Sequence, residues 1–576
     1  MADLPDPIAG YDASSPELAA QYESLRAEDV HTGFLEFLDG GTDRLALDIG
    51  AGSGRDAAWL RQMGFDVVAV EPARGMRDAA ESLHGNGGIR WLDDRLPALT
   101  QTHRLGLSFD VILLSGVLMH VRPEERARAL RKIATLLKPG GRLLITVRDG
   151  GGSPDRPMWP VSQGELEFLA RSHGLAVLKV TDSRDLLARS DVRWTNYVFQ
   201  LPDAGAGALP LLRGIILNDN KSSTYKLGLL RAIARIADAT PALAVERVDE
   251  DVIDLPLGAV ALNWLRMYLP LIAADLPQLP GNRGADRLGF AGEGFRRLLA
   301  DQVVGQDLRI GARFTGERAT AVARALADVR TTISRMPAQF IRYPNSETPV
   351  FDAAPARAPG VRDEIIMDVE TLRAYGTIGV PGPVWRTLQR LGAWVEPVLV
   401  SEWARLIEGF GPGTGRIIAP GAAAAALQWL DPARDTALAR GVALRLIESG
   451  QSVRCVWTSG QLRPDSLDID HCLPWTAWPC GDLWNLFPAR PTVNRNIKRD
   501  RLPSAAALAA ARTGLQTWWE QAWDAEPALA ERFWREVDAA LPGQGDRSFN
   551  DAFEGLEWRR LRLQQDQQVR QWGGIQ

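Results

Sequence analysis

The sequence predicts a multidomain protein with a doubly wound α/β sheet, a mainly helical middle region and a small mixed α/β domain at the C-terminal end. Three observations predict this fold class. Apolar runs and amphipathic stretches alternate over residues 44–201, helical periodicity dominates residues 211 to about 440, and a compact strand-like stretch follows near residue 452. We therefore divide the chain into residues 1–203, 204–440 and 441–576.

The first region contains short apolar runs that we expect to be strands, separated by helical stretches such as DAAWLRQMG and EERARALRKIATLLKPG. Strand and helix in repetition are typical of a parallel sheet with helices on both faces. One or two leading helices are expected over SPELAAQYESLRAEDVHTGFLEFL. The expected strands are RLALDIG, FDVVAVEP, IRWLDD, FDVILLSG, GRLLITVRD, LAVLKVTD and NYVFQL.

A Gly/Ala/Pro-rich stretch at residues 201–210 marks the first domain boundary. The region after it has helical periodicity, as in TYKLGLLRAIARIA and AVALNWLRMYLPLIAA, with short strand-like interruptions. No fixed-period repeat is present. The residues of this middle region indicate no chemistry of their own, and we expect it to position a substrate for the domain that follows.

Composition limits the possible partners. The net charge is −5, so any grip on nucleic acid has to come from a local basic patch. The three cysteines form no C-x-x-C pair, which argues against a zinc ribbon. Their odd number and the enzyme-like composition argue for a reduced, cytoplasmic protein. The sequence shows neither a signal-peptide pattern nor an apolar run of about 18 residues, so we expect no membrane partner.

A glycine-rich turn follows the first expected strand in LALDIGAGSG (45–54). Gly50, Gly52 and Gly54 let a ligand approach the backbone closely just before a helix begins. Asp48 precedes the turn, and Glu71 closes the second strand, where a carboxylate can accept hydrogen bonds from ribose hydroxyls. A glycine turn alone is weak, because nicotinamide-dinucleotide domains use a similar one.

The whole succession resembles the class I S-adenosylmethionine (SAM) methyltransferases over roughly residues 10–203. DIGAGSG matches their D-x-G-x-G-x-G turn, Glu71 the acid after strand two, Asp93 or Asp94 the acid after strand three, and Leu137 to Gly141 their LKPGG stretch. The resemblance implies a Rossmann-like fold and SAM as cofactor. It places the glycines at the amino-acid end of SAM, Glu71 at the ribose, and Asp93 or Asp94 at the adenine.

The methyl acceptor is not indicated by a motif. The position after strand four reads LLSGVLMHV, without the D/N-P-P-Y/W motif of DNA amino-methyltransferases, and no proline-cysteine dipeptide of the C5-cytosine kind occurs. An ordinary restriction-modification base methylase is therefore excluded. His120 can be a base near the methyl group, although a packing histidine is the favoured interpretation. A domain that binds SAM only as a signal also fits.

Near the C-terminal end, His471 is the one histidine after residue 173. Asp470 precedes it in LDIDHCLPW, Asn485 follows 14 residues later, and Asn494 lies 9 residues beyond that. Phosphodiester cleavage needs an activated water and a metal ion, which a neutral histidine and oxygen ligands can provide. A basic cluster that can meet phosphates follows: Arg495, Lys498, Arg499 and Arg501.

These residues resemble the ββα-metal (HNH) nucleases, in the subset whose third catalytic position is asparagine. The resemblance covers about residues 452–505 and implies a metal-dependent endonuclease that cleaves DNA, or less favourably RNA. His471 would activate the water, Asn485 would give structural support, and Asp470 and Asn494 would bind Mg²⁺ or Mn²⁺. The loop NRNIK is one residue longer than the usual N-R-x-K, so Asn496 competes with Asn494. The alternative to a nuclease site is a histidine of the apolar core beside an aspartate that caps a helix.

The combined expectation is a SAM-binding methyltransferase domain fused to an HNH endonuclease, in a setting of bacterial antiviral defence with protein partners. That setting rests on the domain pairing alone. Two alternatives stay open. The chain can be a methyltransferase of a nucleic acid or small molecule that uses the HNH region for substrate binding, or a non-catalytic subunit of a defence complex.

Overall fold

The computed structural model describes residues 6–38, 44–85, 88–150, 153–360, 363–415, 417–542 and 547–574. The chain forms two compact units, Met1–Gly207 and Ala208–Gln576. The division between the units falls four residues after the predicted boundary at 203, inside the Gly/Ala/Pro-rich stretch. The boundary predicted at residue 440 lies within the second unit.

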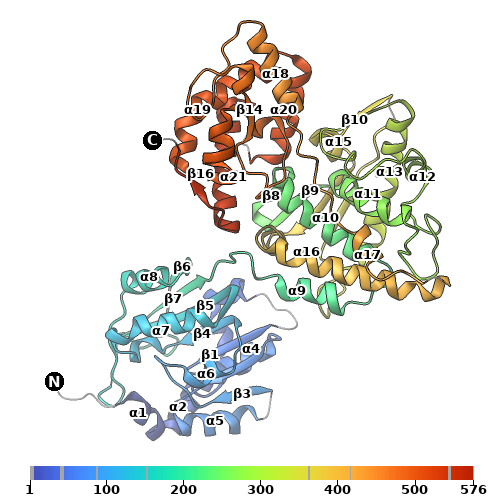
Figure 1. Cartoon of the computed structure of the whole chain (residues 1–576). Coiled ribbons are helices and arrows are strands. Elements are labelled where there is room, and N and C mark those ends of the chain that lie inside the picture. The colour runs from blue at the N-terminus through green and yellow to red at the C-terminus, as the bar shows by residue number, and fades with distance from the viewer. Residues whose placement is uncertain are drawn as a thin grey trace. The chain divides into compact units, whose positions relative to one another are not determined.

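The first unit is built on a seven-stranded sheet with the strand order β3-β2-β1-β4-β5-β7-β6 (Figure 1). Strands β3, β2, β1, β4 and β5 pair in parallel, and β7 lies antiparallel between β5 and β6. Every predicted strand of this region is present. The strands are β1 (Leu45–Ile49), β2 (Asp66–Val70), β3 (Ile89–Leu92), β4 (Phe109–Ser115), β5 (Leu137–Asp149), β6 (Ala176–Ser183) and β7 (Arg193–Gln200).

Helices surround this sheet because its strands are apolar on both faces. Strand β1 is buried from its second residue onward, and two separate apolar clusters form, one on each side of the sheet. The helices and 3₁₀ turns of the unit are α1 (Pro7–Ala13), α2 (Ser15–Glu23), α3 (Ala27–Val30), η1 (Thr32–Phe37), α4 (Arg55–Gln62), α5 (Arg74–His84), α6 (Thr100–Arg104), η2 (Leu118–His120), α7 (Pro123–Leu136) and α8 (Gln163–Ser172).

The second unit has two apolar cores. One gathers side chains mainly from residues 208–427, and the other gathers side chains from residues 439–563. The first core is mainly helical and also includes a four-stranded sheet of order β11-β13-β9-β8, which the short strand-like interruptions in the sequence did not specify. Those strands are β8 (Val245–Arg247), β9 (Val252–Pro256), β11 (Asp352–Pro355) and β13 (Gly376–Pro381).

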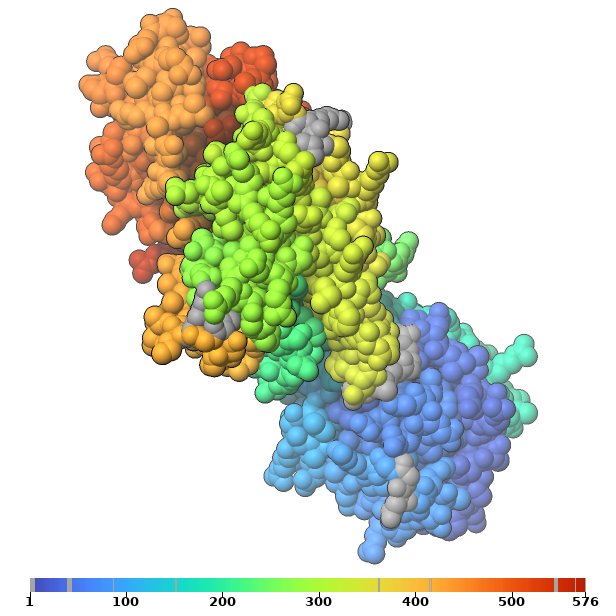
Figure 2. Space-filling view, turned by 90° about the vertical axis from the view of Figure 1, so that its right-hand side faces the viewer, coloured from blue at the N-terminus to red at the C-terminus, as the bar shows by residue number. Residues whose placement is uncertain are grey.

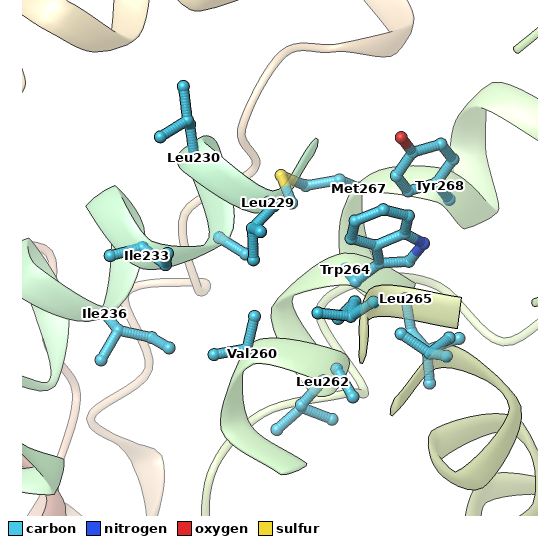
Figure 3. Close-up of a cluster of buried hydrophobic side chains, with 14 of the residues drawn as sticks. Leu229, Leu230, Ile233, Ile236, Val260, Leu262, Trp264, Leu265, Met267 and Tyr268 are labelled. Atoms are coloured by element: carbon cyan, nitrogen blue, oxygen red, sulfur yellow. The ribbon is translucent and has the colours of Figure 1, made fainter. Parts of the chain in front are cut away.

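The main helices of this first core are α10 (Tyr225–Ala239), α11 (Leu257–Ala273), α12 (Glu293–Ala300), α13 (Gly316–Arg335) and α16 (Gly382–Phe410). Their apolar faces are long enough to bury large aromatic side chains. Figure 3 shows Leu229, Ile233 and their neighbours on α10 beside Trp264 and Tyr268 on α11. The Trp264 and Tyr268 rings stack with centroids 4.7 Å apart.

Shorter elements complete the first core: α9 (Leu209–Arg213), the π-helix η3 (Gly214–Asn218), η4 (Pro241–Leu243), η5 (Val248–Glu250), β10 (Arg313–Thr315), α14 (Pro337–Phe340), β12 (Glu364–Ile366), α15 (Val369–Arg373), η6 (Pro412–Thr414) and α17 (Ala422–Ala426). In Figure 2 the green surface that includes α13 adjoins the yellow surface that follows α14. Strands β11 and β12, in that yellow part, contact α13 directly.

The second core surrounds an antiparallel hairpin of β14 (Asp468–His471) and β15 (Leu486–Ala489), followed by the π-helix η9 (Thr492–Lys498). The other elements are α18 (Ala437–Glu448), η7 (Pro464–Ser466), η8 (Leu483–Asn485), β16 (Leu502–Pro503), α19 (Ala505–Trp519), η10 (Glu520–Asp524), α20 (Pro527–Ala540), α21 (Phe549–Gln567) and β17 (Gln571–Trp572). None of the helices in the described part of the chain has the length and hydropathy needed to cross a bilayer.

Removing a core aromatic from the second unit tests this packing. Trp264 is fully buried, whereas Trp394 on α16 is 78% exposed. We expect Trp264→Ala to lower the free energy of unfolding of this unit by about 3–5 kcal/mol, because a large cavity is left behind. Trp394→Ala is the control and should change little. Hydrogen exchange of α11 peptides during urea unfolding measures both, and equal effects would contradict the packing.

Candidate functional sites

A cavity of about 630 Å³ opens at the carboxyl edge of the first sheet, where β1 and β4 end side by side. The turn after β1 and the residues after β4 contribute to its wall, together with the end of β2. Brought together here are Gly50, Gly52, Glu71, Asp94 and His120. Strand order reverses at β1, which is where open α/β sheets bind their ligands.

The glycine turn has a conformation that other residues avoid. Gly50 has φ +72° and Gly52 has φ +56°. A Cβ at Gly50 would lie 2.5 Å from Val117 Cγ2, whereas a Cβ at Gly52 would meet atoms no closer than 3.6 Å and would extend along the cavity wall. Gly54 is the residue before α4 and does not line the cavity. Gly52 therefore leaves room for a ligand against its backbone, whereas the Val117 side chain fills the space beside Gly50.

Glu71 connects the end of β2 to this turn. Its Oε2 accepts a hydrogen bond from the Gly52 amide at 2.8 Å, and its Oε1 accepts one from the Ala73 amide at 2.9 Å. The side chain is buried, and burial raises the pKa of the carboxyl despite these two amide donors. A polar ligand group at this position would compete with backbone amides for the carboxylate.

The structure separates Asp93 from Asp94. Asp94 lines the cavity and is buried, and its carboxylate accepts hydrogen bonds from the backbone amides of Arg95, Thr100 and Thr102. Asp93 is exposed, pairs with Arg77 and is not part of the wall. Of the two predicted candidates, Asp94 is the one at the cavity.

Asp48 is buried outside the cavity wall, at the end of β1. Burial, followed by the negative charge of Asp56, raises the pKa of its carboxyl well above the usual range. Its place in the structure favours a role in supporting the turn over a direct ligand contact.

His120 lies in the cavity wall, in contrast to the packing role that the sequence favoured. Its Nδ1 lies 2.9 Å from the carbonyl oxygen of Pro157, and its Nε2 lies 3.0 Å from the hydroxyl of Tyr11. Because a carbonyl can only accept, Nδ1 carries the proton of the neutral ring and Nε2 accepts from Tyr11. Burial lowers the pKa of His120, so the neutral form is favoured. No sequence motif pointed to Tyr11, which precedes His120 by 109 residues.

A second pocket, of about 410 Å³, lies beside the β14–β15 hairpin and η9. Its wall includes several of the residues that the sequence singled out: Asp470, His471, Asn494, Arg495 and Arg499. Asp468, Arg434 and Trp475 also line it. Asn496 is exposed and does not line the pocket, so the extra loop residue leaves Asn494 facing this site.

His471 is 2% exposed, and neither ring nitrogen has a hydrogen-bond partner in the described part of the chain. Its ring packs edge-on against Trp475, with centroids 5.3 Å apart. Burial, then the positive charges of Arg434 and Lys498, lower the pKa of His471 to about 4. The ring is therefore neutral near pH 7, and its nitrogens keep the capacity to bind a water molecule.

Asp470 is held by two donors. Trp457 Nε1 donates to Oδ2 at 2.7 Å, and Lys498 Nζ donates to Oδ1 at 3.1 Å. Lys498 also donates to the carbonyl of His471 at 2.7 Å. Burial raises the pKa of Asp470, and Lys498 opposes that rise. Lys498 is fully buried, so it supports the strand end and is not exposed for the phosphate contact that the sequence predicted.

Asn494 and Asn485 have different surroundings. The Asn494 amide nitrogen donates to Asp468 Oδ2 at 3.1 Å and to the Ile469 carbonyl at 3.2 Å. Asn485 is fully buried and lies outside the pocket wall. Its Oδ1 accepts from the Leu473 amide at 2.8 Å, and its Nδ2 donates to the carbonyls of Leu473 and Cys480. Asn485 thus fastens the loop that follows β14.

The other three predicted phosphate contacts, Arg495, Arg499 and Arg501, differ from one another in their exposure and in whether they line the pocket. Arg495 is 67% exposed at its side chain and donates to Asp468 at 2.8 Å. Arg499 is exposed in the pocket wall. Arg501 donates through Nε to the Lys498 carbonyl and is not part of the wall. Two of the four basic residues therefore face the pocket.

The chemistry of these donors decides whether a metal ion fits. In the described residues, no group of three or more His, Cys, Asp or Glu side chains is arranged to hold one. Asp470 and Asn494, whose side chains carry oxygen donors, both line the pocket. Two hard oxygen donors suit Mg²⁺, which keeps several water ligands. The residues therefore fit a hydrated hard cation and do not fit zinc.

Comparison with known proteins identifies the first unit. Residues 47–143 match the family model of a methyltransferase domain, and residues 205–427 match that of a domain of unknown function (DUF8808). An uncharacterized methyltransferase of Mycobacterium tuberculosis (strain ATCC 25618 / H37Rv) is 31% identical over 162 residues, which cover 27% of this chain and 59% of that protein. The chain thus contains a methyltransferase domain with a Rossmann-like fold, and it spans a little over half of that relative.

Other methyltransferases are similar to shorter parts of this chain in sequence, or to its first unit in structure. A ubiquinone biosynthesis O-methyltransferase of Azorhizobium caulinodans is 33% identical over 100 residues, which are 17% of this chain and 38% of that protein. A crystal structure of the 1,6-didemethyltoxoflavin-N1-methyltransferase of Burkholderia thailandensis is 23% identical and covers 35% of this chain and 93% of that one, with a TM-score of 0.26. A crystal structure of a TehB-like SAM-dependent methyltransferase of Corynebacterium glutamicum is 22% identical. The match covers 32% of this chain and 97% of that one, with a TM-score of 0.26.

The buried Lys498–Asp470 contact gives a stability prediction. Lys498→Met leaves Asp470 buried without its cation, which should lower the free energy of unfolding of the second unit by about 3–5 kcal/mol. Arg495→Met removes an exposed partner of Asp468 and should change stability little, because solvent already screens that pair. Urea unfolding monitored by hydrogen exchange of the β14 segment distinguishes them. Equal stability of the two variants would show that the buried contact is unimportant.

Proposed function

We propose that the first unit binds SAM and transfers its methyl group to a second substrate. The observation that carries this proposal is the hydrogen bond from the Gly52 amide to Glu71 in the wall of the cavity, in a region that matches a methyltransferase domain. Bound SAM supplies a methyl group on a positively charged sulfur, which is open to attack by a nucleophile. The roles of the surrounding residues follow from their positions.

Gly50 and Gly52 would receive the amino-acid end of SAM, with the closest approach at the backbone of Gly52, where a Cβ would meet no atom closer than 3.6 Å. Glu71 would accept hydrogen bonds from the ribose hydroxyls in place of the Gly52 amide, which then becomes available to the ligand. Asp94, whose carboxylate already caps the turn up to Thr102, would fix the backbone beside the adenine. Gly50, Gly52 and Glu71 keep the roles expected from sequence. Gly54 has no ligand role here because it lies outside the cavity wall, and Asp94, chosen over Asp93, acts through the backbone beside the adenine.

A substitution in the turn tests this proposal. Gly52→Ala should weaken SAM binding by at least about tenfold, because a Cβ enters the cavity at a residue with positive φ. Gly106→Ala is the control: Gly106 has φ +63°, open space around it and no place in the cavity wall. Calorimetric titration with SAM measures both variants. Failure of the wild-type protein to bind SAM would contradict the proposal outright.

We also propose a nuclease function for the second pocket, as a metal-dependent HNH endonuclease acting on DNA. The observation that favours it is a buried histidine, His471, in the same wall as Asp470 and Asn494, whose two ring nitrogens have no hydrogen-bond partner among the residues that the structure describes. Asp470 and Asn494 would hold Mg²⁺ or Mn²⁺, which stabilises negative charge on a phosphate. His471, neutral near pH 7, would take the proton from the attacking water. Arg495 and Arg499 would meet the flanking phosphates.

Plasmid cleavage in Mg²⁺ or Mn²⁺, with and without SAM, tests the nuclease proposal. We expect the wild-type protein to cut and His471→Ala and Asn494→Ala to lose about 10²-fold or more in rate, since each removes a group that acts on the water or the metal. His173→Ala, in the first unit, is the matched control and should cut normally. Circular dichroism and thermal unfolding verify that the variants are folded. Undiminished cleavage by both variants would assign the activity to another site or a contaminant.

The biological setting remains part of the proposal. Bacterial defence against foreign DNA, in the cytoplasm and with protein partners, would join a SAM-dependent domain to a nuclease. If the folded wild-type protein binds SAM but cuts no DNA in any condition, the alternatives take over. The second pocket would then serve as a nucleic-acid grip for the methyltransferase, or the chain would act within a complex.

A further inference from the structure

Cationic side chains contribute to the wall of the cavity in the first unit. Arg148 on β5, Arg156 after it and Arg189 before β7 all line the wall. Burial and the positive charge of Arg189 lower the pKa of Arg148, so the two guanidinium groups repel each other electrostatically. Like charges held close together in a partly buried wall favour an anion between or beside them.

The acidic side chains of the wall are already engaged. Glu71 and Asp94 accept hydrogen bonds from backbone amides, as described above. Asp56 pairs with Arg55 at 2.7 Å, and Asp185 accepts from Arg189 at 2.6 Å and from Trp194 Nε1 at 3.0 Å. Asp29 lies at the rim and is exposed. Asp185 thus compensates Arg189, and the charge of Arg156 has no such compensation.

Arg156 is partly buried, and its guanidinium carbon lies 5.4 Å from the centroid of the Tyr11 ring. No carboxylate in the described part of the chain lies within ion-pair distance of it. The same Tyr11 gives its hydroxyl proton to His120 Nε2. Tyr11 therefore contacts both Arg156, which has room for an anionic partner, and His120, whose Nε2 can accept a proton.

The wall of the cavity also contains flat and apolar side chains. Tyr22, Met119, Met158 and Trp194 line it together with Tyr11. Such surfaces suit an aromatic ring. The cavity volume of about 630 Å³ is within the range of small-molecule sites.

We propose that the methyl acceptor is a small hydroxylated aromatic acid, held through its carboxylate by Arg156, with its hydroxyl proton accepted by His120. This inference rests on the methyltransferase function proposed above. The acceptor O–H bond breaks and its proton moves to His120 Nε2, displacing the Tyr11 hydroxyl. The electron pair left on oxygen forms the bond to the methyl carbon, while the carbon–sulfur pair stays on sulfur. Nδ1 keeps its proton and its contact with Pro157.

Binding to the protein saturated with S-adenosylhomocysteine tests the substrate class. We expect 3,4-dihydroxybenzoate to bind at least about tenfold more tightly than its uncharged methyl ester. Arg156→Met should abolish this preference. Arg128→Met should keep it, because Arg128 is an exposed arginine of α7 outside the cavity wall. Calorimetry measures each affinity.

Turnover with SAM tests the role of His120. His120→Asn should lower kcat for 3,4-dihydroxybenzoate by about 10²-fold or more and leave its affinity within about threefold, because a proton acceptor is lost and the anion contact is kept. Tyr11→Phe should leave kcat within about threefold of the wild-type value, because the Tyr11 hydroxyl is displaced from His120 before the transfer and the ring beside Arg156 is kept. Unchanged kcat in His120→Asn would overturn its role as proton acceptor.

The outcomes are distinguishable from failure of the methyltransferase proposal. Absence of S-adenosylhomocysteine binding would overturn that proposal and this inference with it. Cofactor binding without a preference for the acid over the ester, or with a preference that survives Arg156→Met, would overturn the inference alone. Methylation of a DNA or tRNA oligonucleotide in place of the acid would do the same.

Discussion

The parallel pairing of β1 with β2 on one side and β4 on the other is the constraint on which the first site depends. The chain leaves β1 in one direction across the sheet and returns to β4 on the other side, so no connection covers the edge between these strands. The glycine turn, Glu71 and the residues after β4 all emerge at that open edge. Residues that are far apart in the sequence meet at this edge, and Tyr11 and His120 are in contact although they lie 109 positions apart.

In the second unit a single buried cation has the corresponding role. Lys498 is the last residue of η9, yet its ammonium group lies against Asp470 and the carbonyl of His471 on β14. It therefore ties the short helix to the hairpin at the point where the pocket forms. A buried ammonium without such acceptors would be too costly to retain. The basic cluster thus divides into a structural member, Lys498, and the exposed Arg495 and Arg499, which face the pocket.

The two sites differ in what their polar groups still lack. In the first cavity the carboxylates are occupied by amides and arginines, and Arg156 is left with the Tyr11 ring as its neighbour. In the second pocket Arg495 pairs with Asp468, and the ring nitrogens of His471 have no hydrogen-bond partner among the described residues. The first arrangement favours an anionic ligand, and the second favours a water molecule.

The sequence by itself determined the sheet of the first unit and the residues on which both sites were predicted. Apolar runs of strand length and a glycine turn are local signals, since the period of the side chains and the freedom of the backbone depend on neighbouring residues only. Tertiary structure decided which of Asp93 and Asp94 meets the cavity, that Lys498 is buried, that Asn494 and not Asn496 faces its pocket, and that Tyr11 and Arg156 flank His120. It also added a sheet to the middle region. These outcomes depend on which polar groups other segments bring within hydrogen-bond distance, and spacing along one chain does not contain that information.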